Sequence, residues 1–245
     1  MPRRKEIFEN GEIYHITIRR IGKELLFEDI DDYYRGIFSI YEFNTIEWVE
    51  IRERRRIRRQ IKKMAKISDF PDAVIKDSRD KLVEILAFCF MPNHIHLLVR
   101  QLKEGGISKF MNKFGSGYSS YFRKKYQLSR REHFFGDRFN AVHIETEEQL
   151  RAVFVYLHIN SISLIEPNWK KKGIENPEKV IKFLEEEYRW SSLFDYLGKK
   201  NFPSVTEREF LSKVMGGEQG CKEAIESWVR YKGKIKKFAR LALED

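Results

Sequence analysis

The chain lacks the features of secreted and membrane-spanning proteins. It has only two cysteines, Cys89 and Cys221, and Cys89 falls in an apolar, strand-like run, so we expect reduced thiols and no disulfide. No hydrophobic run approaches the roughly 18 residues needed to span a bilayer, and no apolar stretch of signal-peptide length follows the charged amino terminus. Internal repeats and low-complexity tracts are also absent. We therefore expect a soluble, cytoplasmic protein that does not contact a membrane.

Positive charge is in excess and is concentrated in one segment. The 245 residues include 47 Lys and Arg against 37 Asp and Glu, a net charge of +10. Between Arg52 and Lys66 the chain has nine basic residues and one acid, Glu53. A concentration of this kind favours an anionic partner such as nucleic acid. A helix whose basic face is simply solvated is an equally good interpretation of this segment.

The hydrophobic pattern predicts an α+β fold. A strand, a helix, two strands in a hairpin, a helix and a further strand follow one another, which is the β-α-β-β-α-β order of a ferredoxin-like unit with a four-stranded antiparallel sheet and helices on one face. A helix from Thr146 to about Asn160 follows, and helical patches continue beyond Ser161. The predicted strands are Ile13–Arg19, Lys81–Phe90, His94–Arg100 and Arg138–Ile144, and the predicted helices are Asp31–Phe43, the basic Trp48–Lys66 and Ile107–Tyr126.

Two histidines two residues apart open one of the predicted strands. In the segment FMPNHIHLLVR, His94 and His96 point to the same face because side chains alternate along a strand. Histidine is the commonest protein metal ligand, but two ligands seldom suffice for a site. Two partly exposed strand histidines are the simpler interpretation unless the chain supplies a third ligand.

The helix LRAVFVYLHINSI offers a third ligand and a nucleophile. Tyr156 and Asn160 lie four residues apart, so their side chains share one flank of the helix, whereas His158 lies about 160° from Tyr156. An amide oxygen with two imidazoles can hold a divalent cation and leave positions open, and a nearby phenol can attack a phosphate. Taken alone, Tyr156 fits a packing residue and Asn160 a helix cap. Tyr118 is the rival nucleophile, but the residue four further on is Phe122, which cannot bind a metal.

Four motifs in this order and spacing resemble the single-tyrosine HUH transposases, and most closely the REP-associated tyrosine transposases and their insertion-sequence relatives. The motifs are FMPNHIHLLVR, HFFGDRF (133–139), YLHINSI (156–162) and YRWSS (188–192), and the resemblance spans roughly residues 13–198. One departure is Ser161, where relatives commonly have proline. The basic insert at about 45–78 and the tail after residue 200 are less typical of this family.

The resemblance implies a reaction and a set of functional residues. Tyr156 is the nucleophile that becomes joined to a 5′ phosphate of single-stranded DNA, and His94, His96 and Asn160 hold Mg²⁺ or Mn²⁺. Family members choose their target by an adjoining DNA hairpin. The candidate DNA-binding residues are basic side chains spread over the chain: Arg19, Arg20, Arg52, Arg55, Arg56, Arg59, Lys63, Arg123, Lys124, Arg138, Lys236 and Lys237.

The resemblance also implies an organisation for the chain. We predict a catalytic domain at 1–162 that carries the insert, and a helical extension at 163–245 that takes part in DNA binding. The setting is the bacterial cytoplasm and nucleoid, and relatives act as monomers or as homodimers. Two other functions stay open at this point. One is a host-adopted hairpin-binding protein without strand transfer, and the other is a metal-dependent phosphoesterase that does not need Tyr156.

Overall fold

The core of the protein is a four-stranded antiparallel sheet. The computed structural model describes residues 7–22, 24–67, 77, 79–129, 133–136 and 138–230. The sheet order is β2-β3-β1-β4, as expected for the predicted unit, and β2 and β3 form the predicted hairpin. The strands are β1 (Ile13–Arg19), β2 (Val83–Met91), β3 (His94–Gln101) and β4 (Asn140–Ile144).

The helices lie close to their predicted positions. Capping boxes begin α1 and α4, formed by Asp29 with Asp32 and by Thr146 with Gln149, so the acidic and hydroxyl residues at these starts satisfy backbone N–H groups. Helix α4 ends at Ile159 and continues as a 3₁₀ turn, η1 (Asn160–Leu164), and α6 continues as a π turn, η2 (Phe183–Glu187). The helices are α1 (Ile30–Glu42), α2 (Ile51–Ile67), α3 (Gly106–Tyr126), α4 (Glu147–Ile159), α5 (Trp169–Lys172), α6 (Pro177–Lys182), α7 (Leu193–Tyr196), α8 (Glu209–Met215) and α9 (Gly217–Arg230).

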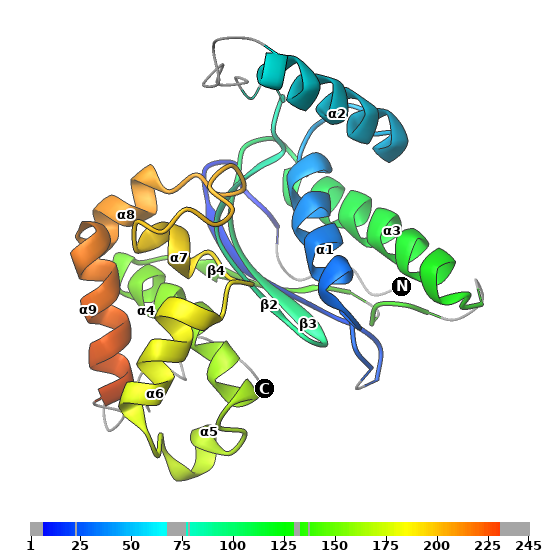
Figure 1. Ribbon diagram of the computed structural model, residues 1–245. Helices are drawn as coiled ribbons and strands as arrows, with labels where there is room; N and C mark the ends of the chain where they lie inside the picture. Colours follow the sequence, from blue (N-terminus) through cyan, green and yellow to red (C-terminus); the bar gives the residue numbers. More distant parts are fainter. Residues whose placement is uncertain are drawn as a thin grey trace.

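Alternate residues of each strand face two different cores. Ile95, Leu97 and Val99 pack with α1 and α3, whereas Leu98 packs with α4 and the helices after it. Figure 1 shows these helix groups on opposite faces of the sheet. The α+β class is therefore confirmed, with one correction to the expected layering. The second face is not left open, because α4 and the C-terminal helices cover much of it.

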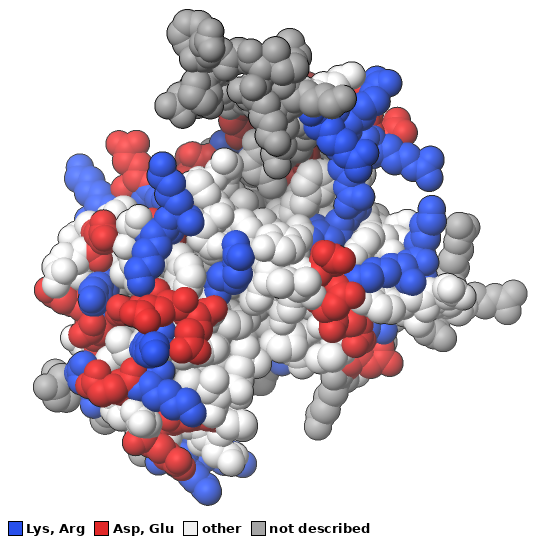
Figure 2. Space-filling model, viewed as in Figure 1, with Lys and Arg blue, Asp and Glu red and all other residues white. Residues whose placement is uncertain are grey.

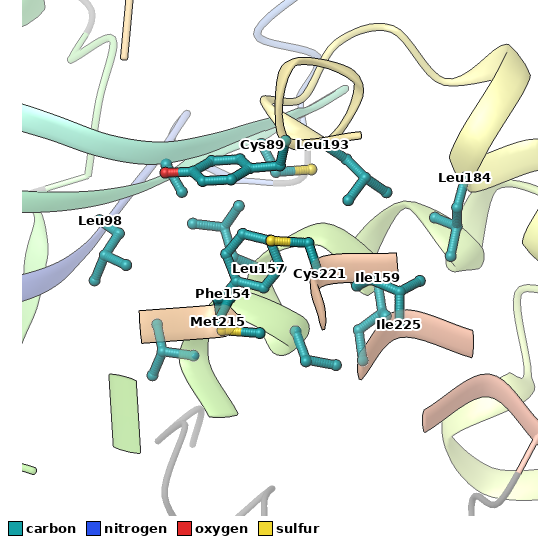
Figure 3. Close-up of a cluster of buried hydrophobic side chains, with 14 of the residues drawn as sticks. Cys89, Leu98, Phe154, Leu157, Ile159, Leu184, Leu193, Met215, Cys221 and Ile225 are labelled. Atoms are coloured by element: carbon teal, nitrogen blue, oxygen red, sulfur yellow. The ribbon is translucent and has the colours of Figure 1, made fainter. Parts of the chain in front are cut away.

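The core on the α4 face joins the sheet to the C-terminal helices. Figure 3 shows Cys89 and Leu98 of the sheet near Phe154 and Leu157 of α4, with Ile225 of α9 beyond them. Both cysteines are buried free thiols, and burial raises the pKa of Cys221 to about 11. Because residues on either side of position 162 share this core, the division into domains at 162 stays a prediction.

The YRWSS segment continues the sheet at the β2 edge. The N–H of Phe90 donates to the carbonyl of Trp190 (2.9 Å), and the N–H of Ser192 donates to the carbonyl of Phe88 (2.9 Å). Cys89 and Ser191 form an antiparallel bridge between them. This motif therefore pairs with the backbone of β2 and protects that edge of the sheet.

No helix in the described ranges is long and apolar enough to cross a membrane.

Candidate active site

His94 and His96 lie together at the start of β3. The Pro92-Asn93 turn precedes the strand, and the alternation of side chains places both rings on the α4 face, as predicted. Their ring centroids are 4.7 Å apart with planes at 80°. His96 is fully buried, whereas His94 is half-buried and contacts Asn93 through its Nδ1 (2.6 Å to Oδ1).

Strand β1 adds a third histidine that the sequence interpretation missed. Thr17 pairs with His96 in the β1–β3 register, and His15 lies two residues earlier on the same face. The Nδ1 atom of His96 is 3.0 Å from Nε2 of His15 and 3.2 Å from Oγ1 of Thr17. The two imidazoles stack with centroids 5.2 Å apart and planes at 13°. The sequence shows that His15, Thr17 and Arg19 share one face of the strand. Only the register of β1 against β3 shows that this face meets His96.

Helix α4 brings Tyr156 against these rings. The Tyr156 ring is 5.9 Å from that of His96 and 5.9 Å from that of His15, with near-perpendicular planes in both cases, and its hydroxyl oxygen is buried. Asn160 follows one turn later and is 5% exposed. Its amide nitrogen donates to the carbonyl of Tyr156 (3.0 Å), which fixes the side chain on the flank of the helix that carries the tyrosine.

Positive charge surrounds the buried imidazole. Burial lowers the pKa of His96 well below its usual value, and the neighbouring His15, His94, Arg19 and Lys170 lower it further. His96 is therefore neutral at physiological pH, which is the protonation state that binds metals. The ammonium nitrogen of Lys170 on α5 lies 5.8 Å from the centre of the Tyr156 ring. Lys170 was not among the predicted site residues because the 170–172 lysine run resembles an ordinary solvated patch.

The donor set suits a divalent cation. Both histidines use Nδ1 in contacts within the protein, so Nε2 is the nitrogen that a metal would take from each ring. The Asn160 amide nitrogen is engaged by backbone, so its oxygen is the corresponding ligand atom. Among the described residues, no group of three His, Cys, Asp or Glu side chains is arranged to hold a metal. Asn160 as the third protein ligand stays a prediction.

The two rival residues lie in hydrophobic cores. His158 contacts the carbonyl of Phe154 (2.8 Å) and Oγ of Ser192 (2.9 Å) through its two nitrogens, and burial lowers its pKa to about 3. Tyr118 lies on the opposite face of the sheet and donates to the carbonyl of Leu26 (2.8 Å), and burial raises its pKa. Both side chains are therefore committed to packing and to hydrogen bonds within these cores.

The predicted DNA contacts outside α2 fall in different environments. Arg19 ends β1 beside His94 in the register and is exposed, as are Arg138 before β4 and Lys124 near the end of α3. Arg123, also near the end of α3, is half-buried and stacks on Phe134, with 5.6 Å between guanidinium and ring centre. Lys236 and Lys237 lie outside the described residues.

The side chain of Arg20 is largely covered by its neighbours. Its guanidinium contacts Glu24 (2.6 Å) and stacks on the rings of Phe122 (4.6 Å) and Phe134 (5.0 Å). Its side chain is only 9% exposed. These contacts hold local structure together, and a role of Arg20 in DNA binding stays a prediction.

The basic helix α2 lies with α1 and α3, on the face away from His96. Arg55 stacks on Phe38 of α1 (5.6 Å), and Lys113 of α3 reaches the carbonyl of Thr45 (2.5 Å) just before α2. Figure 2 shows Lys and Arg side chains gathered over this helix, whereas charges of both signs alternate over the C-terminal helices. Arg52, Arg55, Arg56 and Arg59 are exposed, and Arg56 also pairs with Glu53 (2.6 Å). At Lys63 only the backbone is described.

Comparison with known proteins finds a transposase family that is similar to the part of the chain that carries this site. The fold and the site define an α+β protein with a His-x-His strand and a tyrosine on the helix that packs against it. Residues 45–160 match the model of the family described as "Transposase IS200 like", a range that contains His94, His96, Tyr156 and Asn160. The resemblance to these transposases is confirmed over that range. The match also includes the basic helix α2, which we had set apart as an insert less typical of the family.

A solved structure of a REP-associated tyrosine transposase bound to a REP hairpin is also similar. It shares 14% sequence identity with this chain, with a TM-score of 0.41, and the similarity covers 85% of this chain and 96% of that one. No curated protein matches the sequence.

Proposed function

We propose that this protein is a metal-dependent transposase and endonuclease that cleaves and rejoins single-stranded DNA next to a hairpin through a covalent link to Tyr156. The observation that carries the proposal is the convergence of three elements. Strand β3 supplies His94 and His96, β1 supplies His15, and α4 places Tyr156 with its ring 5.9 Å from that of His96.

The reaction is an exchange of phosphodiester bonds. The phenol oxygen of Tyr156 attacks the scissile phosphorus, a bond from that oxygen to the 5′ phosphate forms, and the bond to the 3′ oxygen breaks. The phenol loses one proton and the leaving 3′ oxygen gains one, so neither water nor a nucleotide cofactor is consumed. Attack by a 3′ hydroxyl on the phosphotyrosine reverses the sequence and rejoins the strand.

Each residue around Tyr156 has a separate task in this scheme. His94, His96 and Asn160 would hold Mg²⁺ or Mn²⁺, with imidazole ligands favouring Mn²⁺ somewhat. The bound ion would polarise a non-bridging phosphate oxygen. Lys170, beside the Tyr156 ring, and Arg19, near His96, supply positive charge where the phosphate and the departing phenolate carry negative charge.

The DNA partner is a single strand that carries a hairpin. The similar structure is described as bound to a REP hairpin, and the exposed arginines of α2 offer this chain a separate basic surface for phosphates. We assign the nucleophile and the metal ligands to residues 1–162, and the charge of Lys170 and a share of DNA binding to the helices that follow. A protein with this activity would work on nucleoid DNA in the bacterial cytoplasm.

Covalent attachment tests the proposal directly. The full-length protein is incubated with end-labelled single strands of about 60 nucleotides, each carrying one hairpin with unpaired flanks, in the presence of Mn²⁺ or of EDTA. Denaturing electrophoresis then separates protein-linked DNA. We expect a slow-migrating band that needs Mn²⁺, disappears with protease and is absent for Tyr156→Phe.

The two alternative functions predict different products in electrophoresis. A hairpin-binding protein without strand transfer would retard the DNA under native conditions and give no covalent band with any hairpin. A phosphoesterase would release cut strands without a protein-linked product, and its activity would survive Tyr156→Phe. Either result would overturn the proposed mechanism.

A further inference from the structure

His15 is neither the proposed nucleophile nor a proposed metal ligand, yet it occupies a buried position where an imidazole is costly to desolvate. It is 3% exposed, lies in the middle of β1 and stacks on the ring of His96. An apolar residue would fill a buried strand position at lower cost, because a buried imidazole has to be desolvated. His15 also precedes the range 45–160 that matches the transposase family.

His15 contacts His96 through Nδ1, the ring nitrogen that is not proposed to bind the metal. An imidazole binds a metal through the nitrogen that carries a lone pair, and a neutral ring has one such nitrogen. In His96, Nδ1 faces Nε2 of His15 (3.0 Å) and Oγ1 of Thr17 (3.2 Å), and both of these atoms can accept a hydrogen bond. If Nδ1 carries the proton, Nε2 of His96 has the lone pair.

We propose that His15 is a positioning residue that accepts a hydrogen bond from Nδ1–H of His96, so that Nε2 of His96 keeps the lone pair that binds the divalent cation. The inference rests on the proposed function. It gives a task to a β1 residue that lies behind a metal site whose proposed ligands come from β3 and the end of α4. Partners of this kind behind a metal-ligating histidine fix its tautomer and its ring orientation, and their loss typically weakens metal binding by about 10- to 100-fold.

The metal-free protein provides the first test. In ¹⁵N-histidine-labelled protein at pH 7.5, long-range ¹H–¹⁵N spectra distinguish the two neutral tautomers of His96, with His96→Gln used to assign its signals. We expect Nδ1 to carry the proton in the wild type. A His96 ring protonated at Nε2 would overturn the proposal whether or not the protein acts on DNA.

Metal affinity provides the second test. Mn²⁺ is titrated into the DNA-free protein, and the unbound ion is followed by electron paramagnetic resonance. We expect His15→Phe, which keeps an aromatic ring of similar size, to weaken binding by about 10- to 100-fold. His15→Gln retains a side-chain acceptor and should recover most of the affinity. Circular dichroism and thermal unfolding show that each variant is folded.

A matched control comes from β4. His143 is a strand histidine opposite Tyr14 on the other face of the sheet, so His143→Phe should leave Mn²⁺ affinity unchanged. Wild-type affinity in a folded His15→Phe protein, or no Mn²⁺ binding by the wild type, would overturn the proposal. Failure of the proposed function appears separately, as Mn²⁺ binding that depends on His15 in a protein that never forms a covalent DNA band.

Discussion

On the α1/α3 face of the sheet, β3 presents Ile95, Leu97 and Val99, all fully buried in hydrocarbon. On the α4 face the same strand presents His94 and His96, followed by Leu98, which packs in the core with α4 and the C-terminal helices. On the first face these three side chains belong to a hydrophobic core. The second is divided between a core and a polar site. The comparison shows that one strand supplies both a hydrophobic core and a histidine cluster by alternating its side chains between two faces.

Two tyrosines on opposite faces give the sharpest test of this difference. Tyr156→Phe should abolish covalent attachment, because the attacking oxygen is removed. Tyr118→Phe removes a buried hydrogen bond to the carbonyl of Leu26, so it should lower the free energy of unfolding by about 1 kcal/mol and retain attachment. The gel assay and urea unfolding measure the two effects. Loss of attachment in a folded Tyr118→Phe protein would contradict the division between the faces.

The buried His158 on the α4 face should make folding stability depend on pH. His158 has a pKa of about 3 in the folded protein against 6.5 for an unperturbed ring. The unfolded chain therefore binds the extra proton as the pH falls from about 6.5 toward 3, and folding stability decreases in that window. At pH 5 the pKa difference corresponds to about 2 kcal/mol relative to pH 7.5.

The pH effect is separable by mutation. His158→Phe should be less stable than the wild type at pH 7.5, because it loses contacts with Ser192 and with the carbonyl of Phe154. The deficit should shrink by about 2 kcal/mol at pH 5, since the variant no longer has this ring to protonate. Urea unfolding at both pH values measures the change. An equal deficit at both would show that His158 does not titrate as its burial implies.

Lys170 tests whether the polar part of the α4 face extends to the helices after residue 162. Lys170→Gln should slow covalent attachment about tenfold at saturating DNA, because one positive charge beside the phosphate and the phenolate is lost. Lys171→Gln on the same short helix removes an equal charge from an exposed neighbour and should change the rate less than twofold. Equal rates for the two variants would restrict the site to the sheet and α4.

The sequence predicted the elements better than it predicted the contacts between them. The observed strand Ile13–Arg19 has the predicted bounds, because a β-branched alternating run between turn residues strongly favours a strand. His15 was missed, since its importance depends on the register that puts Thr17 opposite His96. The covered position of Arg20 could not be predicted for a similar reason. A basic residue after a strand gives no sign that two phenylalanines more than 100 positions away will cover it.

The α2 arginines should have the smallest effect on chemistry, because α2 lies with α1 and α3 on the face away from Tyr156. The triple change Arg52→Gln, Arg55→Gln and Arg59→Gln should weaken hairpin binding and reduce the slope of log affinity against log salt by up to about 3, one for each lost phosphate contact. The rate of covalent attachment at saturating DNA should stay within about twofold of the wild type. Fluorescence anisotropy across a salt series measures the slope.

A matched triple change of Lys179, Lys182 and Lys213 to Gln removes the same charge from exposed positions on the C-terminal helices, where acidic residues alternate with basic ones. This control separates a localised phosphate surface on α2 from a general effect of net charge. If both variants lower the slope equally, hairpin affinity reflects total charge. If only the α2 variant lowers it, the face that carries no chemistry holds the hairpin while the opposite face cuts the strand.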